Sequence, residues 1–391
     1  MSQEQQLNLL KNGKYLFDSI AENFSKIIDP RAADNQTYSL AQLIFCVFIG
    51  SLAGCNNLNE IHTYLHAKKD FICETLSMDT IPSKYTLWIL LVLLDPNAFE
   101  QSFFNWVDGI AKTCGGELIA IDGKALRGTC EKGRPNSYLH VVHALGCHSK
   151  LLLGQVATDK KSNEITAIPK LLQALEVKKS IITIDAAGCQ KRIAKDIIKR
   201  EGNYILALKG NQGLLHKDVE LYFTGLTKEK REELDNDSDY DKGHGRVEKR
   251  SIYIETNIDW LLEYHHWEGL SAIIMVESVR ILKGEETKES RFYISSLKKP
   301  AKKMLECIRG HWEVESFHWS LDVIFNEDQI TAKQGHIAEN LALIRRWVLN
   351  LVRMAGPKKM GLKEKRQTAG WNNQFLLQIL REGFCKEIFT K

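Results

Sequence analysis

Two short apolar runs decide the fold, and both end in an aspartate: Leu118-Ile119-Ala120-Ile121-Asp122 and Ile181-Ile182-Thr183-Ile184-Asp185. Short apolar runs of this kind predict buried strands. A carboxylate at the end of a hydrophobic strand is desolvated, which is costly unless a positive charge balances it. Two such ends on neighbouring strands therefore predict a divalent-cation site. The alternative is structural, with Asp122-Gly123 as a hairpin turn and Asp185 as the cap of the next helix.

The elements around these two runs predict a mixed α/β sheet with helices on its faces. Helices are expected over residues 163–175 and 189–201. Strands are expected over 117–122, 138–148, 151–158, 180–185 and 203–208, with a hairpin turn at 146–149. Three strands followed by alternating helices and strands is the order of such a sheet.

The segments on either side of this region have different patterns. Residues 15–114 are periodic in apolar residues and predict a helical domain, in which Ser83 caps a helix over 84–94. After Asn211 the alternation stops, and the chain is helical again from Ala301 to its end. Between them, 228–245 is highly charged and turn-rich, and strands are expected over 250–256, 270–282 and 290–297. The predicted organisation is a helical domain at 1–114, an α/β domain at 115–212 and 298–391, and a β-rich insertion at 213–297.

Charge is distributed unevenly along the chain. Its 391 residues include 53 Lys and Arg against 49 Asp and Glu, a net charge of +4. Residues 1–110 hold 7 basic and 12 acidic side chains, which leaves 46 and 37 for the remainder. The later part is therefore where a polyanion would be steered.

Cysteine usage and hydropathy predict a cytoplasmic protein. The nine cysteines are scattered singly, without a Cys-x-x-Cys pair, which argues against a disulfide framework and a thiolate zinc site. The polar N-terminus lacks a signal-peptide pattern. The apolar runs at 43–53 and 85–94 are each about half the roughly 20 residues that span a bilayer, so we expect no membrane contact.

A third carboxylate lies on a helix expected over 311–322. At 3.6 residues per turn this segment has an apolar stripe and, beside it, a polar stripe made of His311, Glu315, His318 and Asp322. Glu315 is thereby placed near the core boundary, where it could face a metal on the sheet. The alternative is an ordinary amphipathic helix with a solvated glutamate.

Together these residues resemble insertion-sequence transposases of the Asp-Asp-Glu (DDE) type, specifically the H-repeat-associated kind. The resemblance runs from about residue 17 to 351 and rests on seven motifs in order. They are Ile121-Asp122-Gly123-Lys124 with Arg127-Gly128, Lys161-Ser162-Asn163-Glu164, Thr183-Ile184-Asp185-Ala186 with Gly188-Cys189-Gln190, Ala207-Leu208-Lys209-Gly210-Asn211-Gln212, Gly243-His244-Gly245-Arg246, His311-Trp312 with Glu315, and His318-Trp319 with Leu321-Asp322.

The resemblance implies a ribonuclease-H-like fold in which Asp122, Asp185 and Glu315 hold two Mg²⁺ ions, with Mn²⁺ as a substitute. The partner would be double-stranded DNA, both the terminal inverted repeats and the target, and we expect a homodimer on that DNA. In two-metal chemistry no covalent protein–DNA intermediate is needed. Tyr138 and Tyr204 remain open from sequence as alternative nucleophiles.

The chain departs from the broader superfamily at four positions. Where the acidic helix usually carries an Arg four residues before its Glu and a Lys seven after it, this chain has His311 and Asp322. It also has Ser316 where Asn is expected and Ala187 where a larger residue is expected. Roles of the usual Arg and Lys therefore do not carry over.

Candidate DNA contacts lie in or beside the motifs. Lys124, Arg127, Lys209 and Arg246 are candidates for phosphate contacts, and the alternative for each is a solvated charged face. Asn211 and His244 could hydrogen-bond the DNA backbone or bases, and His311 belongs to the same set. Trp312 and Trp319 either stack on an unpaired base or belong to the core.

The function predicted from these features is transposition, by metal-dependent strand cleavage and strand transfer at terminal inverted repeats. A ribonuclease-H-like nuclease, or an inactive domesticated DNA-binding relative, is the second hypothesis. A helical interaction protein with structural carboxylates is the third. The N-terminal helical domain is expected to read the inverted repeat through residues 82–87, or to mediate protein contacts.

Overall fold

The computed structural model describes residues 13–32, 36–111, 116–130, 137–158, 164–243, 246–282 and 284–384. The strands are β1 (Leu118–Leu126), β2 (Leu139–Gly146), β3 (Leu152–Ala157), β4 (Ile181–Ile184), β5 (Asn203–Leu208), β6 (Asp235–Gly243), β7 (Arg246–Glu255), β8 (Ala272–Leu282) and β9 (Glu285–Ser295).

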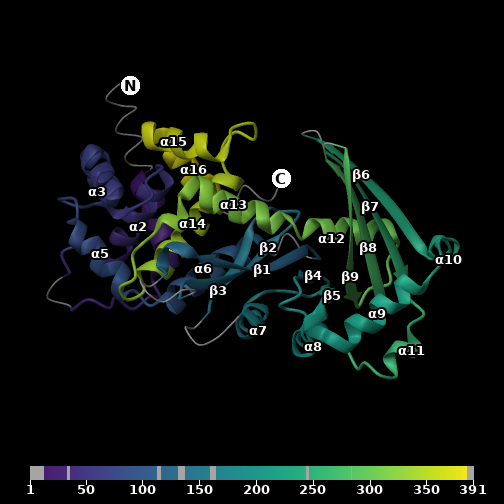
Figure 1. The fold of residues 1–391 in the computed structure, drawn as a ribbon. Coiled ribbons are helices and arrows are strands. Elements are labelled where there is room, and N and C mark those ends of the chain that lie inside the picture. The colour runs from purple at the N-terminus through teal and green to yellow at the C-terminus, as the bar shows by residue number, and fades with distance from the viewer. Residues whose placement is uncertain are drawn as a thin grey trace.

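Helices precede, flank and follow these strands (Figure 1). Before the sheet come α2 (Leu40–Leu52), α3 (Leu58–Ala67), α4 (Lys69–Leu76), α5 (Lys84–Leu93) and α6 (Pro96–Ala111). Between the strands lie α7 (Glu164–Ala174), α8 (Lys191–Lys199), α9 (Gly213–Gly225), α10 (Lys228–Glu233) and α11 (Asp259–Leu262). After the sheet come α12 (Ala301–Gly310), α13 (Glu313–Phe325), α14 (Ile337–Met354), α15 (Leu362–Trp371) and α16 (Asn373–Phe384). Short 3₁₀ turns include η3 (Arg127–Thr129), η4 (Gly210–Gln212) and η5 (Glu327–Gln329).

All nine of these strands form one sheet, in the order β3-β2-β1-β4-β5-β9-β8-β7-β6. β1, β4 and β5 are parallel to one another, whereas β2 and β3 on one side and β9 to β6 on the other pair antiparallel. The mixed α/β sheet, the helical N-terminal region and the Ser83 cap are confirmed, since Ser83 Oγ accepts a hydrogen bond from the Thr86 N–H. The sequence-predicted β-rich insertion extends the central sheet through the β5–β9 pair.

Two sequence predictions about these elements are wrong. β1 does not end at Asp122 but continues to Leu126 beside β2, so the Asp122-Gly123 hairpin turn is also wrong. Residues 228–245 are not simply turns, because they hold α10 and the edge strand β6. β6 escaped prediction because an exposed strand at the edge of a sheet lacks the apolar alternation that identifies strands.

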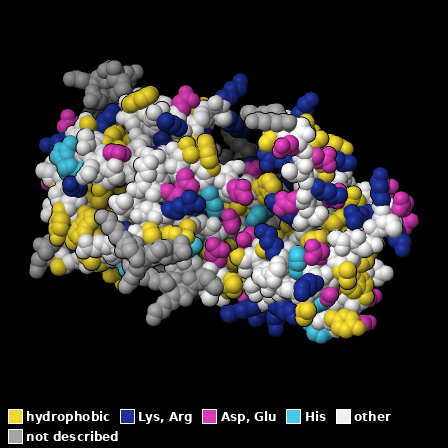
Figure 2. All heavy atoms as spheres, in the orientation of Figure 1, with side chains coloured by type: hydrophobic (Ala, Val, Ile, Leu, Met, Phe, Trp, Pro, Cys, Tyr) yellow, Lys and Arg dark blue, Asp and Glu magenta, His cyan; other side chains and the backbone are white. Residues whose placement is uncertain are grey.

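The strands β6 to β9 extend beyond the central sheet. β9 pairs with β5 only from Phe292 to Ser295, and the rest of β9, from Glu285 to Arg291, continues past the end of β5 at Leu208. At about 3.4 Å per residue this overhang is roughly 24 Å long. It lies beyond the end of the sheet at which β4 and β5 finish. Figure 2 shows a hollow between this part, on the right, and the helical part on the left.

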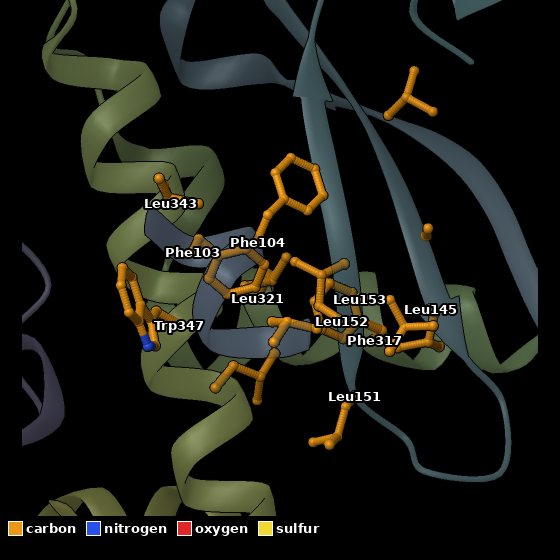
Figure 3. Close-up of a cluster of buried hydrophobic side chains, with 14 of the residues drawn as sticks. Phe103, Phe104, Leu145, Leu151, Leu152, Leu153, Phe317, Leu321, Leu343 and Trp347 are labelled. Carbon is orange, nitrogen blue, oxygen red and sulfur yellow. The ribbon is translucent and has the colours of Figure 1, made fainter. Parts of the chain in front are cut away.

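One aromatic core joins the N-terminal helices to the C-terminal ones. The fully buried Trp347 of α14 has ring-centroid distances of 5.5 Å to Phe103 and 5.4 Å to Trp106 of α6, and 6.0 Å to Phe48 of α2. Figure 3 shows Trp347 and Leu343 pointing toward Phe103, with side chains of β3 and α13 beside them. The helices on both sides of the sheet region in sequence therefore share one core. No helix in the described ranges is long and apolar enough to cross a membrane.

We predict that Trp347→Ala destabilises the protein by about 3–5 kcal/mol, because it removes the largest fully buried side chain from this core. Trp371→Ala is the matched control, since that ring is 75% exposed, and it should change the free energy of unfolding by no more than about 0.5 kcal/mol. Urea unfolding followed by circular dichroism measures both. Equal effects in the two variants would mean that the shared core does not form.

Candidate active site

The two aspartates lie side by side at one end of the parallel strands. Ile121 of β1 is paired with Ile184 of β4, so Asp122 and Asp185 are the next residues on neighbouring strands. β4 ends at Ile184, one residue before the predicted strand end at Asp185. The hollow seen in Figure 2 opens above a group of acidic and histidine side chains near the centre of that face.

A short turn fixes Asp185. Its Oδ1 accepts hydrogen bonds from the backbone N–H groups of Ala187, at 3.1 Å, and Gly188, at 3.3 Å. Asn211 Nδ2 donates to the Ala186 carbonyl at 2.6 Å and ties the loop after β5 to the same turn. Asp185 does not cap the next helix, because α8 begins only after Gln190. The structural alternative for Asp185 is therefore wrong in that form.

The polar stripe of the acidic segment faces the sheet, although α13 itself begins only at Glu313. His311 Nδ1 lies 3.1 Å from Thr183 Oγ1 on β4, and His318 Nδ1 lies 3.7 Å from Asp122 Oδ2 on β1. Asp322, one turn further, accepts hydrogen bonds from Lys124 Nζ at 2.7 and 2.8 Å. Glu315 lies between His311 and His318 on this stripe and is exposed.

Like charges converge on Asp122. Its pKa is raised to about 7, chiefly by burial and then by the charge of Asp185. A hydrogen bond from the Gly123 backbone opposes this rise, and Glu164 and Glu315 add smaller contributions to it. Burial and the charge of Asp185 also raise the pKa of Glu164. The charges of Asp185, Glu164 and Glu315 thus all act on Asp122, and the charge of Asp185 also acts on Glu164.

A buried chain of hydrogen bonds leads from α14 to Asp122. Arg346 donates from Nε to His143 Nε2 at 2.7 Å, and His143 Nδ1 lies 2.9 Å from His318 Nε2. Because Arg only donates, His143 Nε2 accepts, so a neutral His143 carries its proton on Nδ1 and donates to His318. His318 then carries its proton on Nδ1, the atom that faces Asp122. Burial lowers the pKa of both rings, that of His318 to about 3, which keeps them uncharged.

Glu327 anchors the other end of this chain. The fully buried guanidinium of Arg346 donates to Glu327 Oε1 at 2.5 Å and Oε2 at 3.1 Å, and also to the Ala342 carbonyl. His143 lies directly opposite Asp122 in the β1–β2 ladder, so both side chains point to the same face of the sheet. These hydrogen bonds therefore fix the position of α13 relative to β1.

Sequence reasoning assigned no role to Glu164, His143, Arg346 or Glu327. Glu164 belonged to a motif whose chemistry was left undefined. Arg346 had a detectable signal, since Arg345-Arg346 interrupts an otherwise apolar helix and such charges are buried only when paired. His143 was expected as a strand residue, which the structure confirms, but its partners lie about 175 and 203 positions away.

Two glycines of the first motif allow close approaches. A Cβ on Gly123 would lie 1.9 Å from Glu164 Oε1, so the Glu164 carboxylate occupies the space that a side chain would fill. A Cβ on Gly128 would lie 2.3 Å from the carbonyl oxygen of Ile330, so that backbone packs directly on η3.

The residues predicted to contact DNA differ in exposure and in their ion-pair partners. Lys124 is buried, and its ammonium is held by Asp322 and, at 3.7 Å, by Asp328, so the structure gives it an internal ion pair instead of a free phosphate contact. Arg127 is exposed, as is Lys209 in the loop after β5. Arg246 begins β7 and lies 3.5 Å from Glu248. His244 lies outside the described residues.

The two tryptophans are not core residues. Trp312 is 40% exposed, and the guanidinium groups of Arg250 and Arg291 lie 5.6 and 5.3 Å from its ring centroid. These arginines belong to β7 and β9, so Trp312 connects the start of α13 to the overhanging strands. Trp319 is 60% exposed. Tyr204 is fully buried, and its hydroxyl donates to the Glu268 carbonyl, which removes it as an accessible nucleophile.

The donor set suits a hard divalent cation. Carboxylate oxygens are the ligands that Mg²⁺ and Mn²⁺ prefer, and the groups that act on Asp122 are other carboxylates. The space that Gly123 leaves for the Glu164 carboxylate, beside Asp122, fits the same chemistry. Within the described ranges, no three acidic, histidine or cysteine side chains already stand in a metal-binding arrangement, so binding would draw the carboxylates closer together.

Comparison with known proteins identifies the family. Residues 113–351 match the model of the transposase DDE domain, and residues 21–107 match that of a region associated with this domain. "Putative transposase YncI" of Escherichia coli O157:H7 is 36% identical over 380 residues, covering 95% of this chain and 96% of that protein. "H repeat-associated putative transposase YhhI" of Escherichia coli K12 is 34% identical over 368 residues, covering 92% and 97%.

We predict that Arg346→Met destabilises the protein by about 3–5 kcal/mol, because it leaves the buried Glu327 carboxylate without its partner. The double variant Arg346→Met/Glu327→Leu should recover about 2 kcal/mol or more, since no buried charge remains. A double-mutant cycle measured by urea unfolding gives the coupling. The exposed Lys303–Glu306 pair serves as the control and should show about 1 kcal/mol or less. A coupling in the buried pair as small as in this control would contradict the anchoring role of Arg346.

Proposed function

This chain belongs to the DDE transposase family, of the H-repeat-associated kind, and on that premise we propose that it is the transposase of an insertion sequence. Its reaction would be strand cleavage at the terminal inverted repeats and strand transfer into target DNA. The observation that carries the proposal is that the charges of Asp185 and, more weakly, Glu315 act on the buried Asp122. Asp122 and Asp185 follow paired residues on β1 and β4, and Glu315 lies on the stripe of α13 that faces them.

DDE transposase domains generally use divalent metal, and we assign Asp122, Asp185 and Glu315 to hold two Mg²⁺ ions, which Mn²⁺ can replace. Bound Mg²⁺ would lower the pKa of a water or a DNA 3′-hydroxyl and stabilise the leaving oxygen. The protein's own part is orientation. His318 and His143 hold position beside Asp122, and the Asn211 amide fixes the turn that carries Asp185.

The hollow between the helical part and β6–β9 is the proposed path of double-stranded DNA. The overhang lies beyond the same end of the sheet as Asp185, and Arg127, Lys209 and Arg246 are the proposed phosphate contacts there. Asn211, His244 and His311 remain proposed polar contacts to DNA, and Trp312 and Trp319 proposed stacking residues. Lys124 leaves this set because it is buried against Asp322.

The division of labour among the segments is also proposed. Residues 1–114 would read the inverted repeat through α5, where Tyr85 is exposed and stacks on Trp88, and residues 115–212 with 298–391 would carry the chemistry. Residues 213–297, which include the overhang, would form one wall of the DNA path. We propose that the protein acts in the cytoplasm as a homodimer on its DNA.

We predict that Asp122→Asn, Asp185→Asn and Glu315→Gln each reduce strand cleavage by about a thousandfold or more, because each removes a metal ligand. DNA binding should stay within about threefold, since none of the three is a phosphate contact. Glu313→Gln is the matched control on α13, where Glu313 pairs with Lys150 at 2.6 Å, and it should cleave at nearly the parental rate. The assay is nicking of a duplex carrying the element's own ends. A Glu315→Gln protein with parental activity would remove Glu315 from the site, and binding without any cleavage by the parent would favour an inactive relative.

We predict that cleavage needs the cation, whereas DNA binding needs low salt. Mg²⁺ and Mn²⁺ should both support nicking because they take octahedral oxygen ligands, and Ca²⁺ should permit binding with little cleavage because its coordination is longer and looser. Binding affinity should fall by roughly 0.9 log units per phosphate contact for each log unit of salt, with or without metal. Undiminished nicking in chelator would contradict the two-metal assignment and point to a covalent nucleophile.

A further inference from the structure

A fourth carboxylate, Glu164, approaches the same pair of aspartates from the opposite face of the sheet. Side chains alternate along a strand, so Gly123 faces away from the side on which Asp122 meets His318. Glu164 is the first residue of α7, and its carboxylate lies directly against Gly123, where a Cβ would come within 1.9 Å of Oε1 and 2.3 Å of Cδ. A Cβ at position 123 would therefore displace this carboxylate, which is the end of a flexible side chain.

β1 has no strand partner on the β4 side beyond Ile121 among the described residues. β1 pairs with β4 only from Leu118 to Ile121, because β4 ends at Ile184. From Asp122 onward β1 therefore has no strand on that side within the described residues. Asp122 and Asp185 follow the last residues of this pairing, so no further strand pairing encloses them there. Glu315 approaches from the α13 face and Glu164 from the α7 face.

Among the described residues, no Lys or Arg forms an ion pair with Glu164. Its nearest basic group among the described residues is the ring of His140, with Nδ1 3.9 Å from Oε1, which is too long for a hydrogen bond. Burial and the charge of Asp185 raise its pKa. The Glu164 side chain is 27% exposed, so a solvent ion can reach it, whereas the buried carboxylate of Glu117 is held by the Ser149 N–H at 2.6 Å.

We propose that Glu164 is a further ligand of the divalent cation held by Asp122, Asp185 and Glu315, so that the site has four carboxylates instead of three. This inference rests on the proposed function, because it assumes that the three carboxylates bind metal. It also gives Gly123 a role, since any side chain there would push Glu164 out of place. Glu164 would bind from α7 and Glu315 from α13, so the cation would link both helices to the central strands.

The test is Mn²⁺ binding to the full-length protein without DNA, measured by electron paramagnetic resonance of the free ion. Glu164→Gln should weaken Mn²⁺ binding by about tenfold or more, and so should Asp185→Asn. Gly123→Ala, which displaces the Glu164 carboxylate without touching its charge, should act in the same direction. Glu313→Gln is the control and should bind as the parent does. Without metal, Glu164→Gln should melt no lower than the parent, because it relieves repulsion between like charges.

The outcomes separate this inference from the function on which it rests. Parental Mn²⁺ binding by Glu164→Gln, alongside weakened binding by Asp185→Asn, would overturn the role of Glu164 and leave the proposed function standing. A parent protein that binds no Mn²⁺ would overturn both. A Glu164→Gln protein that is destabilised without metal, and whose Mn²⁺ binding is unchanged, would show a structural carboxylate instead of a ligand.

Discussion

The arrangement of this site depends on one buried guanidinium. Arg346 is fully enclosed, and removing a charge from water costs several kcal/mol unless the charge is paired and hydrogen-bonded. Glu327 supplies the pair, and the remaining donors are directed to the Ala342 carbonyl and His143. Because these partners come from η5, α14 and β2, satisfying one side chain fixes three elements. His143 is in turn hydrogen-bonded to His318 on α13, and His318 lies beside Asp122, so the same side chain also helps to position these two residues.

The shared aromatic core explains why this constraint holds. Trp347 follows Arg346 on α14 and packs against rings from α2 and α6, so the helix that positions the site is itself held by the N-terminal helices. A helix end or strand end could shift to relieve a strained polar contact, but a close-packed core resists such movement. The region that precedes the sheet in sequence is therefore part of the scaffold on which the carboxylates are placed.

The sequence predicted what short-range patterns encode. Apolar runs located β1 and β4, the Ser83 cap located α5, and the stripe of residues 311–322 turned His311, His318 and Asp322 toward the sheet as expected. The predictions from sequence failed where contacts between residues that are distant in sequence decide the local structure. β1 runs on past Asp122 because β2 pairs with it to Leu126, which no local pattern indicates. Lys124 was a candidate for a phosphate contact or a solvated face, whereas Asp322, nearly 200 residues later, holds it in the interior.

Several basic side chains around the site are already paired with acidic ones and do not neutralise its carboxylates. Three basic side chains near it have acidic partners: Lys124 has Asp322, Arg346 has Glu327, and Lys150 has Glu313. The two histidines beside Asp122 are kept uncharged by burial. Within the described residues, no Lys or Arg forms an ion pair with Asp122 or Asp185, while Asp122 lies in a buried setting where like charges repel strongly. A polar cluster with that imbalance is unfavourable for the protein alone, and a divalent cation is the simplest group that removes it.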